Sequence, residues 1–324
     1  MSSRAEIIDR LQAKLKALNE TLWERKAEWP QVEMWLSQFD ESPDLDKDEQ
    51  IQMLFLASHF MYFGVREIRA LLRALFRDIF KYKVIAEIRT KNGKTRDKGF
   101  ISSEFVKNLG KTRFMGVGNP SESGSHLLYY FRQENGLGKN YFINSHEIFR
   151  RIGWRRFSWN TIRDQSIERY VFIDDLCGSG TQATEYSKSI VAPLKALNPK
   201  AKVSYYTLFA TSTGLEEVRK LNWFDDVATV VELDASFRSF SDGSRIYKNE
   251  TAPFDKVKAR KICHDRGSRL EPTFPLGWRD GQLLIGFCHN TPDNTLPVFW
   301  YDEPSGHPWN PLFRRFPKQY GWEV

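Results

Sequence analysis

The stretch RYVFIDDLCGSGTQATEYSKSIV, residues 169–191, constrains the fold more than any other part of the chain. An apolar run typical of a buried strand ends in two adjacent acids, passes through a loop with two glycines, and enters a helical pattern. The segment therefore predicts a strand, a tight loop and a helix in direct succession.

The same alternation extends over most of the chain after residue 99. Short β-rich runs predict strands at 113–118, 169–174, 202–211, 226–234, 282–290 and 296–302, and helical patterns at 123–135, 181–198, 213–222 and 252–265. Strands that alternate with helices are typical of a sheet covered on both faces. We predict an α/β fold with a mostly parallel sheet flanked by helices.

The first 95 residues show a different pattern. Apolar residues at Ile8, Leu11 and Leu15 follow one helical face, and Ser3 with Glu6 forms a capping box before it. Further helices are expected at 47–64 and 65–84. The polar segment 89–99 is a candidate boundary, so we predict an all-helical N-terminal region at 1–95 and an α/β domain at 96–324.

Composition limits the classes of ligand and compartment. A net charge of +7 with 14% aromatic residues suits a phosphate-bearing ligand or nucleic acid, although a solvated basic face is an alternative because no Lys/Arg block is present. The 3 cysteines are far apart, and no apolar run approaches the roughly 20 residues of a membrane span. The N-terminus does not resemble a secretory signal, so we expect a cytoplasmic protein that does not enter a membrane.

Asp174 and Asp175 fall at the carboxyl end of a predicted strand, where open α/β sheets bind ligands. Gly178 and Gly180 allow a tight turn that presents backbone N–H groups, and Thr181 begins a helix whose positive end favours a phosphate. Carboxylates suit hydroxyl groups or a metal ion, so a sugar phosphate would satisfy both halves of the loop.

Two other interpretations of the acid pair are open to test by sequence. The acids could cap a turn, with the glycines serving only its geometry. A nucleotide hydrolase would instead need a phosphate loop of the form GxxxxGK[ST]. The chain has GKT at 93–95 and 110–112, but Ile88 and Phe105 stand where the first glycine belongs, which excludes that motif.

The segment VFIDDLCGSGTQA resembles the phosphoribosyl diphosphate (PRPP) motif of type I phosphoribosyltransferases. The resemblance implies that Asp174 and Asp175 contact the ribose hydroxyls and, with PRPP bound, a Mg²⁺ ion. The residues implied to form the PRPP and 5′-phosphate loop are Cys177, Gly178, Ser179, Gly180 and Thr181. Cys177 stands where an aliphatic residue is usual, so it is either a small packing residue or a thiol of low pKa.

Gly178 occupies the position of the acid beside the base in hypoxanthine-guanine enzymes, which argues against purine salvage. A base for the acceptor would then come from elsewhere, and His289 is a candidate. The resemblance also implies a pyrophosphate loop after an earlier strand, with Lys111 and Arg113 adding positive charge. Its candidate residues are Gly118, Asn119, Ser121, Ser123, Gly124 and Ser125. A plain strand–turn–helix connection is the alternative.

The C-terminal stretch GFCHNTPDNTLPVFWYD, residues 286–302, places many polar groups between apolar runs. Turn chemistry explains part of this pattern. An acceptor-side hood is the functional interpretation, and its candidates are His289, Asn290, Thr291, Asp293, Asn294 and Thr295. The Cys-His pairs of the chain do not have zinc-finger spacing, so we predict no structural metal.

The motifs FIDDLCGSGTQ and NTPDNTLPVFW, together with the helical start, resemble a family of phosphoribosyltransferase-like proteins from bacterial conflict systems. That resemblance implies an effector of antiphage operons, some linked to retrons, acting as a toxin. Three hypotheses follow: an enzyme that transfers phosphoribosyl groups or hydrolyses PRPP or nucleotides, a non-catalytic sensor of PRPP or a nucleotide, and a nucleic-acid-associated component. A protein or nucleic-acid partner would dock on the basic helical N-terminal region.

Overall fold

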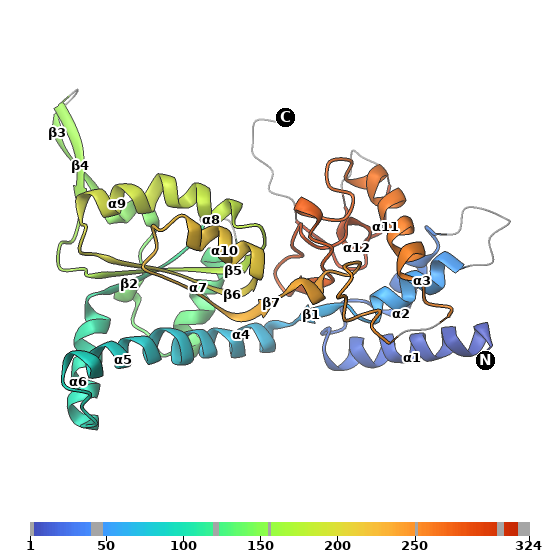
Figure 1. Cartoon of the computed structure of the whole chain (residues 1–324), viewed down its shortest axis with the longest axis horizontal. Coiled ribbons are helices and arrows are strands. Elements are labelled where there is room, and N and C mark those ends of the chain that lie inside the picture. Colours follow the sequence, from blue (N-terminus) through green and yellow to red (C-terminus); the bar gives the residue numbers. More distant parts are fainter. Residues whose placement is uncertain are drawn as a thin grey trace. The chain divides into compact units, whose positions relative to one another are not determined.

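The computed structural model describes residues 3–39, 48–118, 123–154, 157–249, 252–302 and 308–316 (Figure 1). The chain forms two compact units, one from Met1–Arg66 with Asp234–Val324 and the other from Glu67–Leu233. This grouping differs from the predicted division between residues 95 and 96. The helices that follow residue 66 belong with the sheet, because Phe76 and Phe80 pack against Phe114 of its first strand.

The second unit is built on a four-stranded parallel sheet, as the alternation of strands and helices predicts. Its strands lie in the order β2 (Thr112–Gly116), β5 (Arg169–Cys177), β6 (Lys202–Thr211) and β7 (Asp226–Leu233). All neighbouring pairs are parallel, so the carboxyl ends of the strands meet at one edge. The α/β fold with helices on both faces is confirmed.

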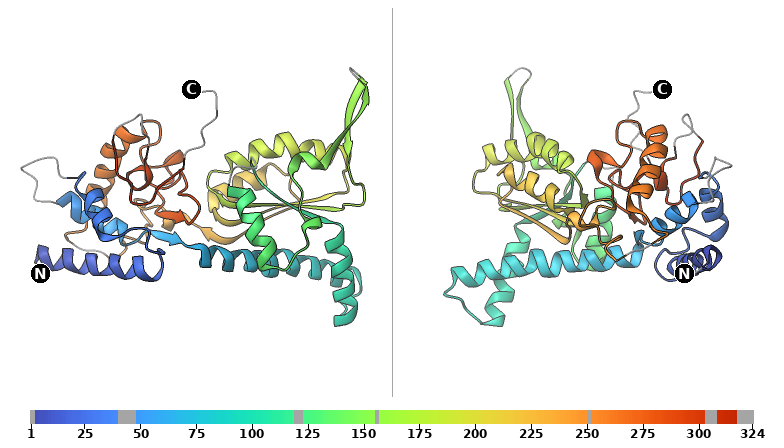
Figure 2. Two further views of the ribbon diagram at one scale, coloured as in Figure 1. Left: turned by 180° about the vertical axis from the view of Figure 1, so that it is seen from behind. Right: turned by 45° about the vertical axis from the view of Figure 1, so that its right-hand side comes forward.

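Helices cover the two faces of this sheet (Figures 1 and 2). One face carries α8 (Thr181–Tyr186), a π-helical turn (Ser187–Val191), α9 (Ala192–Leu197) and α10 (Ser212–Lys220). The other face carries α7 (Ser123–Glu134), α6 (Lys98–Gly110) and a long helix made of α4 (Val65–Ala74), a π-helical segment (Leu75–Lys81) and α5 (Tyr82–Lys91). Aromatic side chains fill the second face, where Phe114 and Phe131 lie 5.2 Å apart.

A two-stranded antiparallel hairpin, β3 (Phe149–Trp154) and β4 (Phe157–Ile162), interrupts the alternation between α7 and β5. Short 3₁₀ turns at Lys139–Tyr141 and Ser145–Ile148 lead into it. The sequence pattern predicts no helix or strand in this stretch.

The first unit combines helices from both ends of its sequence. It contains α1 (Arg4–Thr21), α2 (Trp29–Leu36), α3 (Asp48–Ala57), α11 (Lys256–Leu270) and α12 (Pro297–Trp300), with 3₁₀ turns at Ala235–Phe237 and Trp278–Asp280. The predicted capping box is present at α1, since Ser3 N–H donates to Glu6 and Glu6 N–H to the Ser3 hydroxyl. Strands β1 (Met61–Phe63) and β8 (Ile285–Phe287) pair in parallel.

Two predicted elements of this unit were wrong in type or extent. The helix expected at 47–64 ends at Ala57, and Met61–Phe63 forms β1. The strand expected at 296–302 is instead the helical turn α12, because Pro297 at its first position has the fixed φ of a helix start and no N–H for a sheet. The N-terminal region is otherwise helical, as predicted.

One apolar core joins the two segments of the first unit. Trp35 of α2 is fully buried, its indole N–H donates to the carbonyl of Val298 at 2.7 Å, and its ring lies 5.0 Å from that of Phe299. Phe60 and Phe313 stack at 4.0 Å. The N-terminal helices therefore complete their core with residues that come after position 234 in the chain. Within the described residues, no helix is both long and apolar enough to cross a membrane.

Candidate functional site

The acid pair lies at the carboxyl end of β5, in the middle of the edge where the strands of the sheet end. Asp174 pairs in register with Thr207 of β6, and the preceding Ile173 pairs with Gly116 of β2. Loops that follow β2, β5 and β6 consequently start beside one another. The predicted position of the pair on a strand end agrees with the structure.

The two carboxyl groups differ in environment although they are adjacent. Asp174 is buried, with 3% of its surface exposed, whereas Asp175 is half-buried. Both oxygens of Asp174 accept hydrogen bonds, one from the Tyr205 hydroxyl at 3.0 Å and one from the Asp175 N–H at 3.0 Å. One Asp175 oxygen accepts from the N–H of Leu176 at 2.8 Å. Asp175 is thus the member of the pair that water or a ligand can reach.

Burial raises the pKa of Asp174 well above that of an ordinary carboxyl group, and the neighbouring charge of Asp175 adds to the shift. Burial likewise raises the pKa of Cys177 to about 12, with Asp174 contributing. Cys177 is also 2% exposed and packs in the core, so it fits the predicted packing role and not that of a reactive thiolate. Burial and the neighbouring carboxyl group thus both favour a proton on Asp174.

The loop after the acid pair has the tight geometry that its glycines predict. Gly180 precedes α8 with φ of 75°, in the left-handed region that favours glycine. The Ser179 and Thr181 hydroxyls lie 2.8 Å apart, and both residues are half-buried. Thr184 closes the first turn by donating its N–H and its hydroxyl to the carbonyl of Gly180. The loop therefore places two hydroxyl groups at the start of a helix.

Residues of β6 and α10 hold this loop in place, and sequence reasoning missed them. The Thr211 hydroxyl donates to the carbonyl of Gly178 and accepts from the N–H of Gly214. A methyl group on Gly214 would come within 2.5 Å of the Gly178 carbonyl oxygen, so the close approach requires glycine. Tyr205 was missed too. The sequence pattern predicts its strand, but it does not show which residue of β6 reaches Asp174.

The predicted pyrophosphate loop begins at the correct edge. The N–H of Val117 donates to the Ile173 carbonyl at 3.1 Å, so the chain leaves β2 beside the acid pair, and Gly118 has φ of 93°. Ser123 and Gly124 open α7, with Ser125 next in its first turn. Asn119 and Ser121 lie outside the described residues. The role of this loop in binding stays a prediction.

The basic residues expected to assist that loop lie at the wrong end of the sheet. Arg113 pairs in register with Tyr170, at the amino ends of β2 and β5, and Lys111 immediately precedes β2. Their side chains form ion pairs there, Lys111 with Glu168 at 2.6 Å and Arg113 with Asp164 at 3.6 Å. Four residues of an extended strand, roughly 13 Å, separate this position from Asp174.

His289 and the predicted acceptor-side residues belong to the first unit, whereas the acid pair belongs to the second. His289 stacks on Phe287, with ring centroids 5.4 Å apart. The other predicted acceptor-side residues form hydrogen bonds with the main chain or with other side chains of their own unit. These residues are Asn290, Thr291, Asp293, Asn294 and Thr295. Turn and loop structure therefore accounts for these contacts, and an acceptor-side role stays a prediction.

The acid pair fits a magnesium ion only together with a ligand. Among the described residues, no group of three or more His, Cys, Asp or Glu side chains is placed to hold a metal. Asp174 is buried, so the half-buried Asp175 is the better candidate. Mg²⁺ commonly binds one or two carboxylates and completes its shell with substrate phosphates and water, so the pair is compatible with an ion that arrives with a diphosphate.

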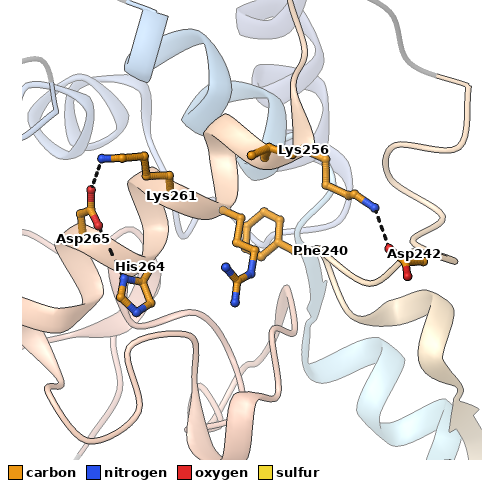
Figure 3. A pocket seen from close by; sticks show the side chains of 8 residues that line it. Phe240, Asp242, Lys256, Lys261, His264 and Asp265 are labelled. Carbon is orange, nitrogen blue, oxygen red and sulfur yellow. Dashed lines mark hydrogen bonds and ion pairs between the residues drawn. The ribbon is translucent and has the colours of Figure 1, made fainter.

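A pocket of about 400 Å³ lies elsewhere, along α11 of the first unit (Figure 3). It is lined by Phe240, Asp242, Lys256, Val257, Arg260, Lys261, His264 and Asp265. Lys261 pairs with Asp265 at 2.6 Å and Lys256 with Asp242 at 3.5 Å, so much of its charge is neutralised locally. It contains none of the predicted site residues, and we base the site on the strand ends and not on this hollow.

Comparison with known proteins gives one match over most of the chain. The model of the family PRTase-CE matches residues 32–315. No curated protein matches the chain.

Similar solved structures include orotate phosphoribosyltransferase from Aeropyrum pernix, with 12% identity over 42% of this chain and 73% of that chain, and a TM-score of 0.25. Xanthine-guanine-hypoxanthine phosphoribosyltransferase of Helicobacter pylori is 10% identical over 54% of this chain and 91% of its own, with a TM-score of 0.26. The AQ2163 protein from Aquifex aeolicus is 10% identical over 64% of this chain and 86% of its own, with a TM-score of 0.29. These structural similarities are too low to carry an argument, so the family assignment rests on the family model.

The contact between the loop and α10 predicts the effect of Gly214→Ala. The added methyl group would approach two carbonyl oxygens of the loop to 2.5 Å and 2.7 Å, which forces the backbone to move. We expect a loss of about 1–3 kcal/mol in the free energy of unfolding, measured with urea. Gly110→Ala is the control, since its methyl group would meet nothing within 4 Å. Equal stability of the two variants would contradict the close packing.

The burial of Asp174 predicts an unusual pH dependence of stability. Because its pKa is higher in the folded than in the unfolded state, the folded protein retains a proton that the unfolded chain has lost. Stability should therefore fall as pH rises from the ordinary carboxyl range through the raised pKa. Asn at this position is always neutral and keeps both hydrogen bonds, because the Tyr205 hydroxyl can also accept.

Asp174→Asn should accordingly melt at a higher temperature than the wild type at neutral and mildly alkaline pH, and at the same temperature in acid. Thermal unfolding over a pH series measures the difference. The exposed Asp9→Asn on α1 serves as the control and should show no such trend. A difference that is constant with pH would show that Asp174 does not titrate in this way.

Proposed function

The chain belongs to the PRTase-CE family, and on this premise we propose that the acid pair and its loop bind PRPP or a nucleotide. The observation that carries the proposal is the placement of a buried and a half-buried carboxyl group at a strand end, directly before a hydroxyl-bearing loop and helix. Carboxyl groups suit the ribose hydroxyls, and the loop with the helix start suits a phosphate.

The two halves of the loop divide the ligand between them. Asp175 would accept hydrogen bonds from the ribose, and Asp174 would hold its neighbour in place through the N–H of Asp175. Ser179 and Thr181 would donate to the 5′-phosphate, and the loop after Gly118 would receive a diphosphate. Binding energy from the phosphate, remote from the reacting carbon, would position that carbon for reaction.

We propose that the reaction class is transfer of the phosphoribosyl group to an acceptor, or hydrolysis of PRPP or a nucleotide. Departure of a diphosphate leaves positive charge on the sugar, and the anionic Asp175 would stabilise it. Asp175, with Asp174 beside it, would hold a Mg²⁺ ion, which would supply positive charge to balance that of a diphosphate. Gly178 carries no side chain that could take a proton from the acceptor. Another residue would have to act as the general base, and His289 stays the predicted candidate.

Thermal unfolding with PRPP and Mg²⁺ tests the ligand first. A ligand at a hundredfold its dissociation constant should stabilise the wild type by about 2.7 kcal/mol. Asp174→Asn/Asp175→Asn should fold but show no shift, and Asp9→Asn/Asp78→Asn, which removes two exposed acids, should shift like the wild type. If neither the wild type nor the control shifts, PRPP is the wrong ligand and nucleotides should be tried. A shift in the acid-pair variant equal to the wild type would contradict the site.

Release of pyrophosphate or phosphate by the same preparations distinguishes an enzyme from a sensor. Turnover that depends on the acid pair supports the enzyme. A thermal shift without any product, across nucleobases, nucleotides and RNA as acceptors, supports a non-catalytic sensor that uses the same site.

We also propose that the protein acts in the bacterial cytoplasm as the effector of an antiphage system, in some cases one linked to a retron. The resemblance of the FIDDLCGSGTQ and NTPDNTLPVFW segments to conflict-system proteins supports this role. In a host that carries the complete operon, Asp174→Asn/Asp175→Asn should abolish any reduction in phage plaques, whereas Asp9→Asn/Asp78→Asn should preserve it. Full protection by the acid-pair variant would contradict an effector role for the site.

A further inference from the structure

The hairpin of β3 and β4 is rich in arginine and contains no acid of its own. Between Glu147 and Asp164 the sequence contains five arginines, two tryptophans and two phenylalanines, with no acid and no lysine. The two flanking acids are already engaged, since Glu147 caps a turn at Asn144 and Asp164 pairs with Arg113. Nothing in this stretch offsets the arginines.

Among the described side chains of the hairpin, those that contribute to the core of its unit lie at its base. Ile148 and Ile162 are 2% and 5% exposed and belong to the core beneath α9, and Phe149 packs against it. The strands then extend away from the sheet in full register as a separate ribbon (Figures 1 and 2). Strand pairing therefore continues beyond the residues that pack in the core.

One side of this ribbon combines an aromatic ring with arginines. Trp159 is 60% exposed, and Arg163 follows it on the same side of the strand, because side chains alternate with a period of two. Arg150 of β3 pairs in register with Thr161, which lies between them. Within the described part of the chain, the side chains of Arg150, Trp159 and Arg163 make no hydrogen bond or ion pair. We call these three residues the hairpin face.

The arginines of the helical region contrast with this arrangement. Arg69 and Arg73 of α4 both pair with Glu134 of α7, at 2.7 Å and 2.6 Å, and Arg77 pairs with Asp78 at 2.6 Å. The charges of these three guanidinium groups are therefore balanced by acids of their own unit. The helical region was the predicted place for a nucleic-acid partner, but these three of its arginines are each paired with an acid, unlike Arg150 and Arg163 of the hairpin face.

The hairpin face is separate from the proposed ligand site. Strand β4 lies beside α9, at the far end of the helical stretch that begins at Thr181 after the Gly180 loop. That stretch of helix spans about 25 Å at 1.5 Å per residue. A ligand at the acid pair and a partner on the hairpin face would therefore occupy different ends of the unit.

We infer that the hairpin face binds single-stranded nucleic acid. An exposed indole offers a surface on which an unpaired base stacks, and the guanidinium groups of Arg150 and Arg163, which follow it toward the core end of the hairpin, bind the next phosphates along the strand. Aromatic stacking accepts any base, so recognition would depend little on sequence. Duplexes keep their bases stacked on one another and would use only the charges.

Fluorescence anisotropy of the full-length protein with a labelled oligothymidine of about 16 nucleotides tests the inference. Trp159→Ala should weaken binding about 5- to 150-fold. Arg150→Ala/Arg163→Ala should lower the slope of log affinity against log salt by about 1.4, since each phosphate contact on a single strand contributes about 0.7. An oligouridine of the same length, tested in parallel, shows whether RNA or DNA is preferred, and a duplex should bind more weakly.

Matched variants separate this site from general basic charge. Tyr129→Ala removes another exposed aromatic ring of the same unit, and Arg260→Ala/Lys261→Ala removes two cations along α11. Neither should change the affinity by more than about twofold, in line with surface changes outside a contact. Equal losses in these controls would show non-specific attraction and overturn the inference, as would unchanged binding by Trp159→Ala.

The same variants distinguish this inference from the proposed function. Trp159→Ala should retain the full thermal shift with PRPP and Mg²⁺, and Asp174→Asn/Asp175→Asn should retain oligonucleotide binding. If Trp159→Ala instead loses only the PRPP shift, the hairpin serves the ligand site and the nucleic-acid inference is wrong.

Discussion

Burial of β5 on both faces is the constraint on which the second unit depends. Its first six residues are all buried, between β2 on one side and β6 on the other. A strand so completely enclosed cannot carry two acids near its carboxyl end unless neighbouring groups provide partners for them. Tyr205 and the backbone of the following residue supply those partners for Asp174. The carboxyl group of Asp174, which precedes the loop, is therefore held in a fixed position at the sheet edge.

That arrangement explains why much of the second unit could be predicted from sequence. Continuous apolar runs gave the sheet strands and amphipathic runs gave the helices, because each element buries a surface of its own period. The acid pair was found because two carboxylates at the end of an apolar strand have few structural explanations. Contacts between distant residues had no such signal. Tyr205 looks like any aromatic strand residue, and Thr211 and Gly214 look like an ordinary helix start.

The errors in the first unit have a related cause. Residues 58–63 were predicted as helix because their apolar character continues that of α3, yet Met61–Phe63 pairs with β8, which lies over 220 residues away. The stretch from Leu296 to Tyr301 is buried throughout and so resembles a core strand, although Pro297 starts a helical turn. The hairpin was missed because pairs of arginines interrupt its apolar residues, so the stretch has neither a continuous apolar run nor a regular alternation that would indicate a strand. Local sequence periodicity gives no signal for strand pairing between residues far apart in the sequence, or for a strand that is not buried.

The core shared by the two ends of the chain also bears on how the protein is made. Helices α1 to α3 leave the ribosome early, but Trp35 has no Val298 or Phe299 to contact until nearly the whole chain has followed. At about 5–20 residues per second, translation of the second unit alone takes roughly ten to thirty seconds. During that interval the second unit can fold, while the apolar faces of the first three helices stay unburied because the residues that cover them have not yet been synthesised. An interrupted message would release a product that has a complete sheet and acid pair but an unfinished first unit, exposed to chaperones and proteases.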